Sequence, residues 1–164
     1  AIGGPLSVID KALSKAKSAG AKIYLDQEYR LIIFIPKVTK TSDNDIIAIA
    51  TAKEIEYALL NYNQTSAQKI EFGIGVHTGE MAVESQDDKI KFVSLGNTIA
   101  IAKRVAENSN QNVLLSEPIY RKNFGKVKVE KVADTGFWQV RQVVDRSNYD
   151  DFLYKFLNRQ KAAK

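Results

Sequence analysis

The first candidates for chemistry are the only histidine of the chain, His77, and a serine in an apolar context, Ser116. A zinc site needs several nitrogen or sulfur ligands, and the chain has no second histidine and no cysteine. Ser116 has no base beside it in the sequence and no nucleophile-elbow pattern around it. We therefore expect a structural role for His77, and we exclude disulfide and thiol chemistry.

Three glycines, Gly73, Gly75 and Gly79, are the next candidates, because glycine loops can hold phosphates. Here the Gly-x-Gly pair lies inside an apolar, strand-like run, which predicts close backbone packing or a bulge instead of a phosphate loop. Gly79 follows a threonine at a predicted tight turn. We expect that turn to need a backbone shape that is closed to β-branched residues.

Composition limits the remaining possibilities. The chain has 164 residues, of which 45% are apolar, and this suits one domain with a single core. The net charge is +5, but the basic residues are scattered and no aromatic residues interleave with them, so we expect no nucleic-acid partner. No apolar run approaches the ~20 residues of a membrane span, and no signal-peptide pattern is visible. We expect a cytoplasmic domain.

Hydrophobic periodicity and turn residues predict the elements. We expect helices over 7–19, capped by Ser7, over 45–63, from 96 to about 108, over 117–122 and over 149–160. We expect strands over 21–25, 29–35, 69–76, 80–85, 89–94, 112–116, 126–132 and 137–144, with a polar loop over 37–44. This order of helices and hairpins predicts an α+β fold. We divide the chain into a linker or cloning remnant (1–6), a domain (7–145), and a C-terminal helix with a basic tail (146–164).

Two segments together resemble a known family. Phe72-Gly-Ile-Gly-Val-His-Thr-Gly-Glu80, followed by Leu95-Gly-Asn-Thr-Ile-Ala-Ile-Ala-Lys-Arg-Val105, resembles the catalytic domain of class III adenylate and guanylate cyclases. In that family the strand reads GIGIHTGEV and the helix reads GDTVNLAARLE. The resemblance implies a ferredoxin-like βαββαβ core with extra hairpins.

The same resemblance implies a reaction and a set of residues. Class III cyclases join a 3′-hydroxyl to the α-phosphorus of a nucleoside triphosphate, using two metal ions and an asparagine and an arginine from the partner subunit. In this chain the arginine position is Arg104, whereas the asparagine position is Ala100. The base-contacting positions fall at Asn97 and Tyr24.

The metal-binding positions are the most altered. Aligning Arg30–Phe34 with the family's second metal strand places Gln27-Glu28-Tyr29 over its Gly-Asp-Gly turn, so Glu28 becomes the candidate metal ligand. A shift of the register would put Asp26 there instead. Both glycines of the turn are replaced. No strand resembling the family's first metal strand, FxDIxGFT, precedes the predicted helix over 7–19, so we expect either that the sequence is truncated before it or that the element is missing.

These changes favour a non-catalytic regulatory or interaction domain on a nucleotidyl cyclase scaffold, a pseudoenzyme in a longer signalling protein that needs no cofactor. The alternative is an active adenylate or guanylate cyclase that uses Mg²⁺ or Mn²⁺ and depends on an N-terminal strand or a partner subunit. A third interpretation is a nucleotide-binding sensor without turnover. As a partner we expect a second copy or another cyclase-like domain, engaging the hairpin over 80–94 with Met81, Val83, Ile90, Phe92 and Val93.

Overall fold

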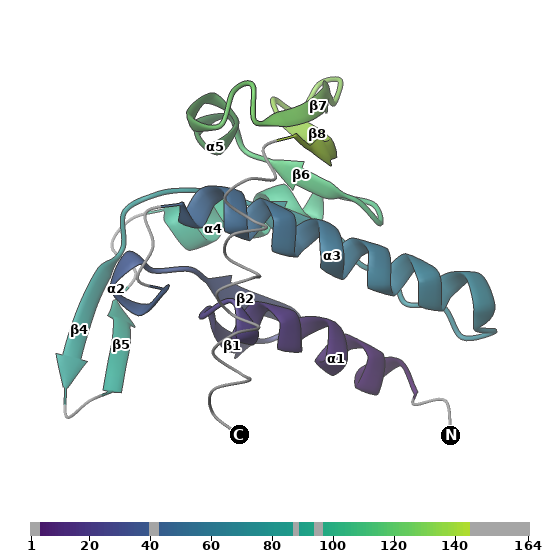
Figure 1. Cartoon of the computed structure of the whole chain (residues 1–164), viewed down its shortest axis with the longest axis horizontal. Helices are drawn as coiled ribbons and strands as arrows, with labels where there is room; N and C mark the ends of the chain where they lie inside the picture. Colours follow the sequence, from purple (N-terminus) through teal and green to yellow (C-terminus); the bar gives the residue numbers. More distant parts are fainter. Residues whose placement is uncertain (1–3, 40–42, 87–88, 94–96, 145–164) are drawn as a thin grey trace.

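The computed structural model describes residues 4–39, 43–86, 89–93 and 97–144 (Figure 1). The helices are α1 (Pro5–Ser18), α2 (Pro36–Thr39), α3 (Asn44–Thr65), α4 (Thr98–Glu107) and α5 (Glu117–Lys122). The strands are β1 (Lys22–Asp26), β2 (Tyr29–Ile33), β3 (Ile74–Val76), β4 (Ala82–Gln86), β5 (Lys89–Val93), β6 (Val113–Leu115), β7 (Val127–Lys131) and β8 (Trp138–Val143). The α+β fold predicted from the sequence is confirmed. The helix expected over 149–160 and the basic tail lie outside the described residues.

Within the described residues, the strands are divided among three sheets. One sheet has four strands in the order β3-β6-β8-β7, with β3 parallel to β6 and the other pairs antiparallel. The hairpins β1-β2 and β4-β5 each form a two-stranded sheet. The order α1-β1-β2-α2-α3-β3 follows the expected βαββαβ core from its first helix onward, with the short α2 added, and β2 and β3 are not hydrogen-bonded to each other.

Several boundaries differ from the prediction. Helix α1 begins at Pro5, inside the segment expected to be a linker, and Gly4 is its N-cap in place of Ser7. Proline suits this position because its missing N–H would have no partner in the first turn. Part of the loop expected over 37–44 is the short helix α2.

The strand expected over 69–76 is reduced to β3, because a side chain takes the place of a strand partner near its start. The buried Asn63, near the end of α3, accepts a hydrogen bond from the backbone N–H of Ile70 at 2.7 Å and donates one to its carbonyl at 2.8 Å. The side-chain amide of Asn63 thus holds the backbone at Ile70 in place, and no neighbouring strand is needed there.

Helix α3 lies between two groups of buried side chains. One packs against the four-stranded sheet and includes Ile46, Ile49, Val76, Val113, Leu115 and Val140. The other packs against α1 and includes Ala12, Leu13, Ile55, Leu59 and Ile70. Apolar residues therefore surround much of α3, as expected for a helix that is buried on more than one side. None of the described helices combines the length and the apolar composition that crossing a membrane requires.

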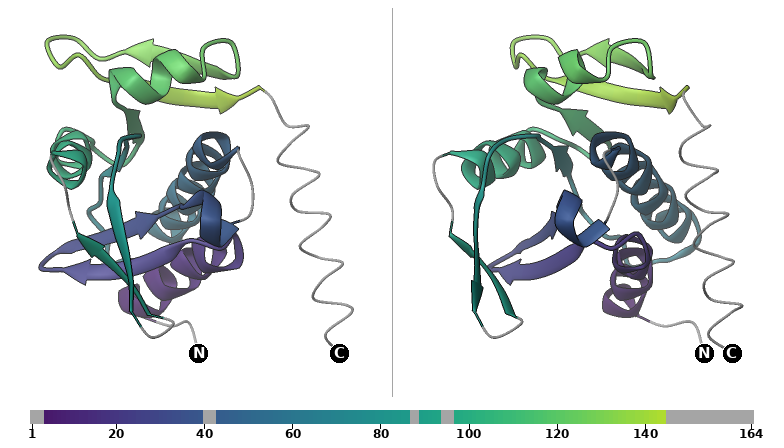
Figure 2. Two further views of the ribbon diagram at one scale, coloured as in Figure 1. Left: turned by 90° about the vertical axis from the view of Figure 1, so that its left-hand side faces the viewer. Right: turned by 60° about the vertical axis from the view of Figure 1, so that its left-hand side comes forward.

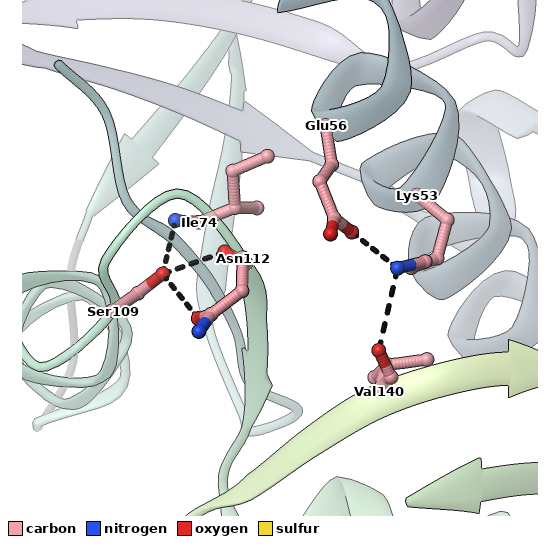
Figure 3. A network of polar contacts seen from close by, with 6 residues as sticks. All are labelled: Lys53, Glu56, Ile74, Ser109, Asn112 and Val140. Atoms are coloured by element: carbon pink, nitrogen blue, oxygen red, sulfur yellow. Dashed lines mark hydrogen bonds and ion pairs between the residues drawn. The ribbon is translucent and has the colours of Figure 1, made fainter. Parts of the chain in front are cut away.

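Polar contacts hold the helices α3 and α4 against strands of the four-stranded sheet (Figure 3). On α3, Lys53 forms an ion pair with Glu56 and donates to the carbonyl of Val140 on β8 at 3.3 Å. After α4, the Oγ of Ser109 accepts from the N–H of Ile74 at 3.1 Å and donates to the carbonyl of Asn112 at 2.6 Å. These contacts hold α3 to β8 and the end of α4 to β3.

Candidate functional site

Gly75 in β3 and Gly73 just before it determine where α4 lies. A Cβ at Gly75 would stand 2.4 Å from the backbone nitrogen of Ala106 and 2.7 Å from the carbonyl oxygen of Ala102. A Cβ at Gly73 would stand 2.4 Å from the carbonyl oxygen of Ala106. Backbone therefore packs directly on backbone, as predicted for the Gly-x-Gly pair. Because Ile74 and Val76 pack with residues of α3, α3 and α4 lie on opposite faces of β3 (Figure 2).

Gly79 is needed for space and not for its backbone angles. It does not have a positive φ, which corrects the expectation of a special backbone shape. A Cβ at this position would stand 2.6 Å from Oγ1 of Thr98, the first residue of α4. That hydroxyl donates to the carbonyl of Glu80 at 2.8 Å, so the turn and the start of α4 form one packed unit.

The tip of the β1-β2 hairpin is a two-residue turn. Asp26 pairs with Tyr29, so only Gln27 and Glu28 lie outside the ladder. Gln27 has a φ of 54°, a conformation that glycine adopts at less cost. The side chain of Glu28 is exposed.

Helix α4 contacts this tip through two side chains one turn apart. Nζ of Lys103 lies 2.5 Å from Oδ2 of Asp26 and 4.7 Å from the centre of the Tyr29 ring. The hydroxyl of Tyr29 donates to the carboxylate of Glu107. This hydrogen bond is the largest reason that the pKa of Tyr29 rises to about 12, with burial and nearby carboxylates adding to it.

The described residues do not assemble a metal site. No three histidine, aspartate or glutamate side chains within the described ranges converge on one point. The carboxylate of Asp26 already faces an ammonium group, and a divalent cation would have to displace it. Glu28, the candidate ligand of the sequence analysis, lies beside Asp26 at the turn but does not share the contact with Lys103.

The other predicted positions are exposed to solvent. Asn97, Ala100 and Arg104 are all exposed, and their spacing of three and four residues places them along one side of α4. Lys103 is about 100° around the helix from Arg104, so the two side chains leave α4 in different directions. Tyr24 is 36% exposed in the middle of β1. Asn97, Ala100 and Arg104 are thus exposed, and the contacts with the hairpin tip come from Lys103 and Glu107 instead.

The sequence analysis did not predict the contact between Lys103 and Asp26, although a lysine at position 103 differs from the family pattern. Lys103 stands where the family pattern GDTVNLAARLE has its second alanine after the leucine. An alanine there could not reach the hairpin. A lysine at that position was the available signal, but its partner is separated from it by 77 residues.

His77 has an unexpected partner in Ser116. Its Nδ1 lies 2.6 Å from the Oγ of Ser116, and burial lowers the pKa of the imidazole. Ser116 is only 2% exposed, so a substrate cannot reach this hydroxyl. The pair connects the end of β3 to the junction of β6 and α5, which is a structural arrangement.

Solved structures identify the fold. The guanylyl cyclase Cya2 superimposes with a TM-score of 0.65 at 21% identity, over 87% of this chain and 83% of that one. The guanylate cyclase domain of RhGC from Catenaria anguillulae, determined in complex with GTP, gives 0.63 at 18% identity, over 84% and 81%. The adenylyl cyclase CyaB from P. aeruginosa gives 0.55 at 17%, over 84% and 82%. No protein-family model and no curated protein matches the sequence. The chain has the fold of the class III cyclase catalytic domain.

Proposed function

We propose that this chain is a non-catalytic regulatory or interaction domain built on the nucleotidyl cyclase scaffold. The observation that carries the proposal is the ion pair between Lys103 and Asp26. Cyclase chemistry needs divalent cations that bind carboxylates and phosphates at the same time. The ammonium group of Lys103 neutralises the carboxylate of Asp26 but, unlike a metal ion, offers no open coordination position for a nucleotide.

Position 100 supports the same conclusion. The resembling family places an asparagine there to orient the reacting groups, and the methyl group of Ala100 can neither donate nor accept a hydrogen bond. Loss of one oriented donor lowers a rate by about 10²–10³. With Asp26, the alternative metal position, also neutralised, we expect no useful turnover.

The exposed face of α4 supports a role in association. It carries Asn97, Ala100 and Arg104, together with Ile101, which is 36% exposed. We propose that this face and the β4-β5 hairpin pair with a second copy of the chain or with another cyclase-like domain in a cytoplasmic signalling protein. Sedimentation over a wide concentration range tests this association, because the apparent mass of a pairing domain rises with concentration.

The alternative is an active adenylate or guanylate cyclase that uses Mg²⁺ or Mn²⁺. The exposure of Arg104 favours it, since an arginine that acts on a nucleotide held by another subunit must be reachable from outside. A sensor that binds a nucleotide without converting it is a third possibility, between the interaction domain and the active cyclase.

An assay for cyclic nucleotide separates these functions. We incubate the chain with ATP or GTP and Mg²⁺ or Mn²⁺, and we expect no product above a control without protein. Arg104→Ala and the matched surface variant Arg121→Ala are measured in parallel; Arg121 lies on α5, and its side chain is 76% exposed. Product that disappears in Arg104→Ala and persists in Arg121→Ala would overturn the proposal. Calorimetric titration with the same nucleotides reveals a sensor without turnover.

A further inference from the structure

The turn between α5 and β7 presents an aromatic ring to solvent. Phe124 is 75% exposed, the largest exposed fraction among the large apolar side chains of the described residues. The exposed Val144, at the end of β8, donates its N–H to the carbonyl of Lys126 at 2.8 Å, so a second apolar side chain lies at the same end of the β7-β8 hairpin. Figure 1 shows α5, β7 and β8 together at one end of the molecule.

The ring of Phe124 is supported from behind. It stands nearly perpendicular to Tyr120, with ring centres 6.0 Å apart, and Tyr120 stacks on Trp138 at 4.1 Å. The buried side chain of Asn123 donates to the carbonyl of Ile119 at 2.8 Å and so fixes the backbone just before the ring. A single apolar residue on a surface is ordinary, but a ring that is held in place and still exposed loses little conformational freedom when it binds.

Basic residues surround this ring in the chain. Residues 117–131 contain five basic and two acidic residues, and so carry +3 of the net charge of +5. Both carboxylates are already paired, Glu117 with Arg121 and Glu130 with Arg141. The cations of this segment that pair with no carboxylate of the described residues are Lys122, Lys126, Lys128 and Lys131.

We propose that the α5–β7 turn docks on the surface of an anionic lipid bilayer, with Phe124 entering the headgroup region and the surrounding lysines facing the lipid charges. Buried apolar area and attraction to anionic lipids are the two contributions that hold peripheral proteins on membranes. The carboxylate of Asp45, on α3, accepts from the buried amide of Asn123 at 3.4 Å and therefore faces the inner side of the turn.

Two features favour a lipid surface over a protein or a nucleic acid. The unpaired cations are all lysines, and an ammonium group lacks the rigid fork with which arginine recognises one particular carboxylate or phosphate. Single-stranded nucleic acids stack on successive aromatic rings, whereas Phe124 is the one largely exposed ring among residues 117–144. The ring of Trp138 already contacts Tyr120 and the ammonium group of Lys131. A diffuse negative surface that accepts one ring fits both features.

This inference goes beyond the proposed interaction role and is compatible with it. In Figures 1 and 2 the tip of the β4-β5 hairpin points away from the end of the molecule that α5, β7 and β8 form. A chain that is docked through the α5–β7 turn therefore keeps this hairpin free to pair with another domain.

Sedimentation with lipid vesicles tests the docking. The full chain is mixed with vesicles of phosphatidylcholine that contain about 30% phosphatidylserine, and we expect saturable binding. We expect at least tenfold weaker binding to pure phosphatidylcholine, and a similar loss when NaCl is raised from about 0.1 to 0.5 M. Equal binding to both kinds of vesicle, or no binding of the folded chain to the anionic ones, would refute the proposal.

A pair of aromatic variants tests the ring. Phe124→Gln is compared with Tyr57→Gln, because Tyr57 on α3 is 67% exposed and lies outside the turn. We expect about tenfold weaker binding to anionic vesicles only for Phe124→Gln. A folded Phe124→Gln variant that binds like the wild type would refute the insertion of the ring. A fall in Tm that exceeds that of Tyr57→Gln by more than about 6 °C would show that the ring is packed within the fold, which also refutes it.

A pair of charge variants tests the lysines. Lys126→Gln combined with Lys128→Gln is compared with Lys11→Gln combined with Lys17→Gln, two exposed positions on α1 that change the net charge equally. Because each cation near an anionic membrane contributes about fivefold in binding, we expect a loss on the order of 25-fold only for the first combination. Equal losses would show that net charge alone attracts the chain, and the turn would then not be the docking site.

A nucleic-acid probe tests the other kind of anionic surface. A fluorescein-labelled oligothymidine of about 20 nucleotides is titrated with the chain and followed by fluorescence anisotropy. We expect weaker binding than to anionic vesicles and no effect of Phe124→Gln. Binding that is tighter than to vesicles and is lost in Phe124→Gln would assign the turn to nucleic acid and overturn the proposal. The outcome of the cyclic-nucleotide assay does not depend on any of these results.

Discussion

Substituting Gly75 by alanine tests whether backbone contact really positions α4. The new Cβ would stand 2.4 Å from the nitrogen of Ala106 and 2.7 Å from the oxygen of Ala102. Favourable carbon contacts begin near 3.5 Å, so α4 must shift by about 1 Å. Overpacking typically costs about 1–3 kcal/mol, and we expect about 3 kcal/mol because helix backbone, unlike a side chain, cannot rotate away.

Urea unfolding followed by circular dichroism measures this cost. For a domain of this size, about 3 kcal/mol corresponds to a fall in Tm of roughly 6–12 °C. The matched control is Gly4→Ala, since no heavy atom lies within 4 Å of a Cβ at Gly4; because Gly4 is the N-cap of α1, we expect this control to lose no more than about 1 kcal/mol. If both variants lose the same free energy of unfolding within about 0.5 kcal/mol, the close packing of α4 on β3 is refuted.

Three further outcomes are expected. The imidazole of His77, the only histidine, should titrate below pH 6.5 in proton NMR, because burial lowers its pKa. As the pH falls through 6.5, the unfolded chain takes up the proton before the folded chain does, so the free energy of unfolding decreases. His77→Gln should make that decrease smaller. The hydrogen bond to Glu107 is the main reason that the pKa of Tyr29 rises to about 12. The contribution of Tyr29 to the stability of the fold should therefore be constant up to pH 10 and be lost between pH 10 and 12. We measure it as the difference in Tm between the wild type and Tyr29→Phe, which should shrink as the pH rises from 10 to 12. Asn63→Ala should cost about 3 kcal/mol in urea unfolding, because it leaves two buried backbone groups of Ile70 without partners.

Local sequence was sufficient for most of the elements. The predicted order of helices and hairpins is present from α1 to β8, and α5 has the predicted bounds of 117–122. This worked because hydrophobic period, proline and glycine act within a few residues of where they stand. The prediction that Gly73 and Gly75 mark close packing was also correct, since a glycine inside an apolar strand typically marks a bulge or a close approach of another backbone.

Some predictions failed because a distant or side-chain group replaced the expected local one. The strand expected from residue 69 is shorter because the amide of Asn63 bonds Ile70 where a strand would have done so. At Gly79 the space beside Thr98, and not the backbone angle, requires glycine. The start of α1 differs for a local reason, because Pro5 suits the first position of a helix, where a backbone N–H would have no partner.

The sequence by itself determined the α+β class, the order of the elements and the substitutions at the cyclase positions, including Ala100. Only the tertiary structure showed that Lys103 neutralises Asp26, that Arg104 is exposed, and that β2 and β3 face one cavity. The physical reason is range. A turn or a helix forms from contacts among neighbours in the chain, whereas an ion pair across 77 residues depends on where α4 lies against β3, and that position is set by packing over the whole domain.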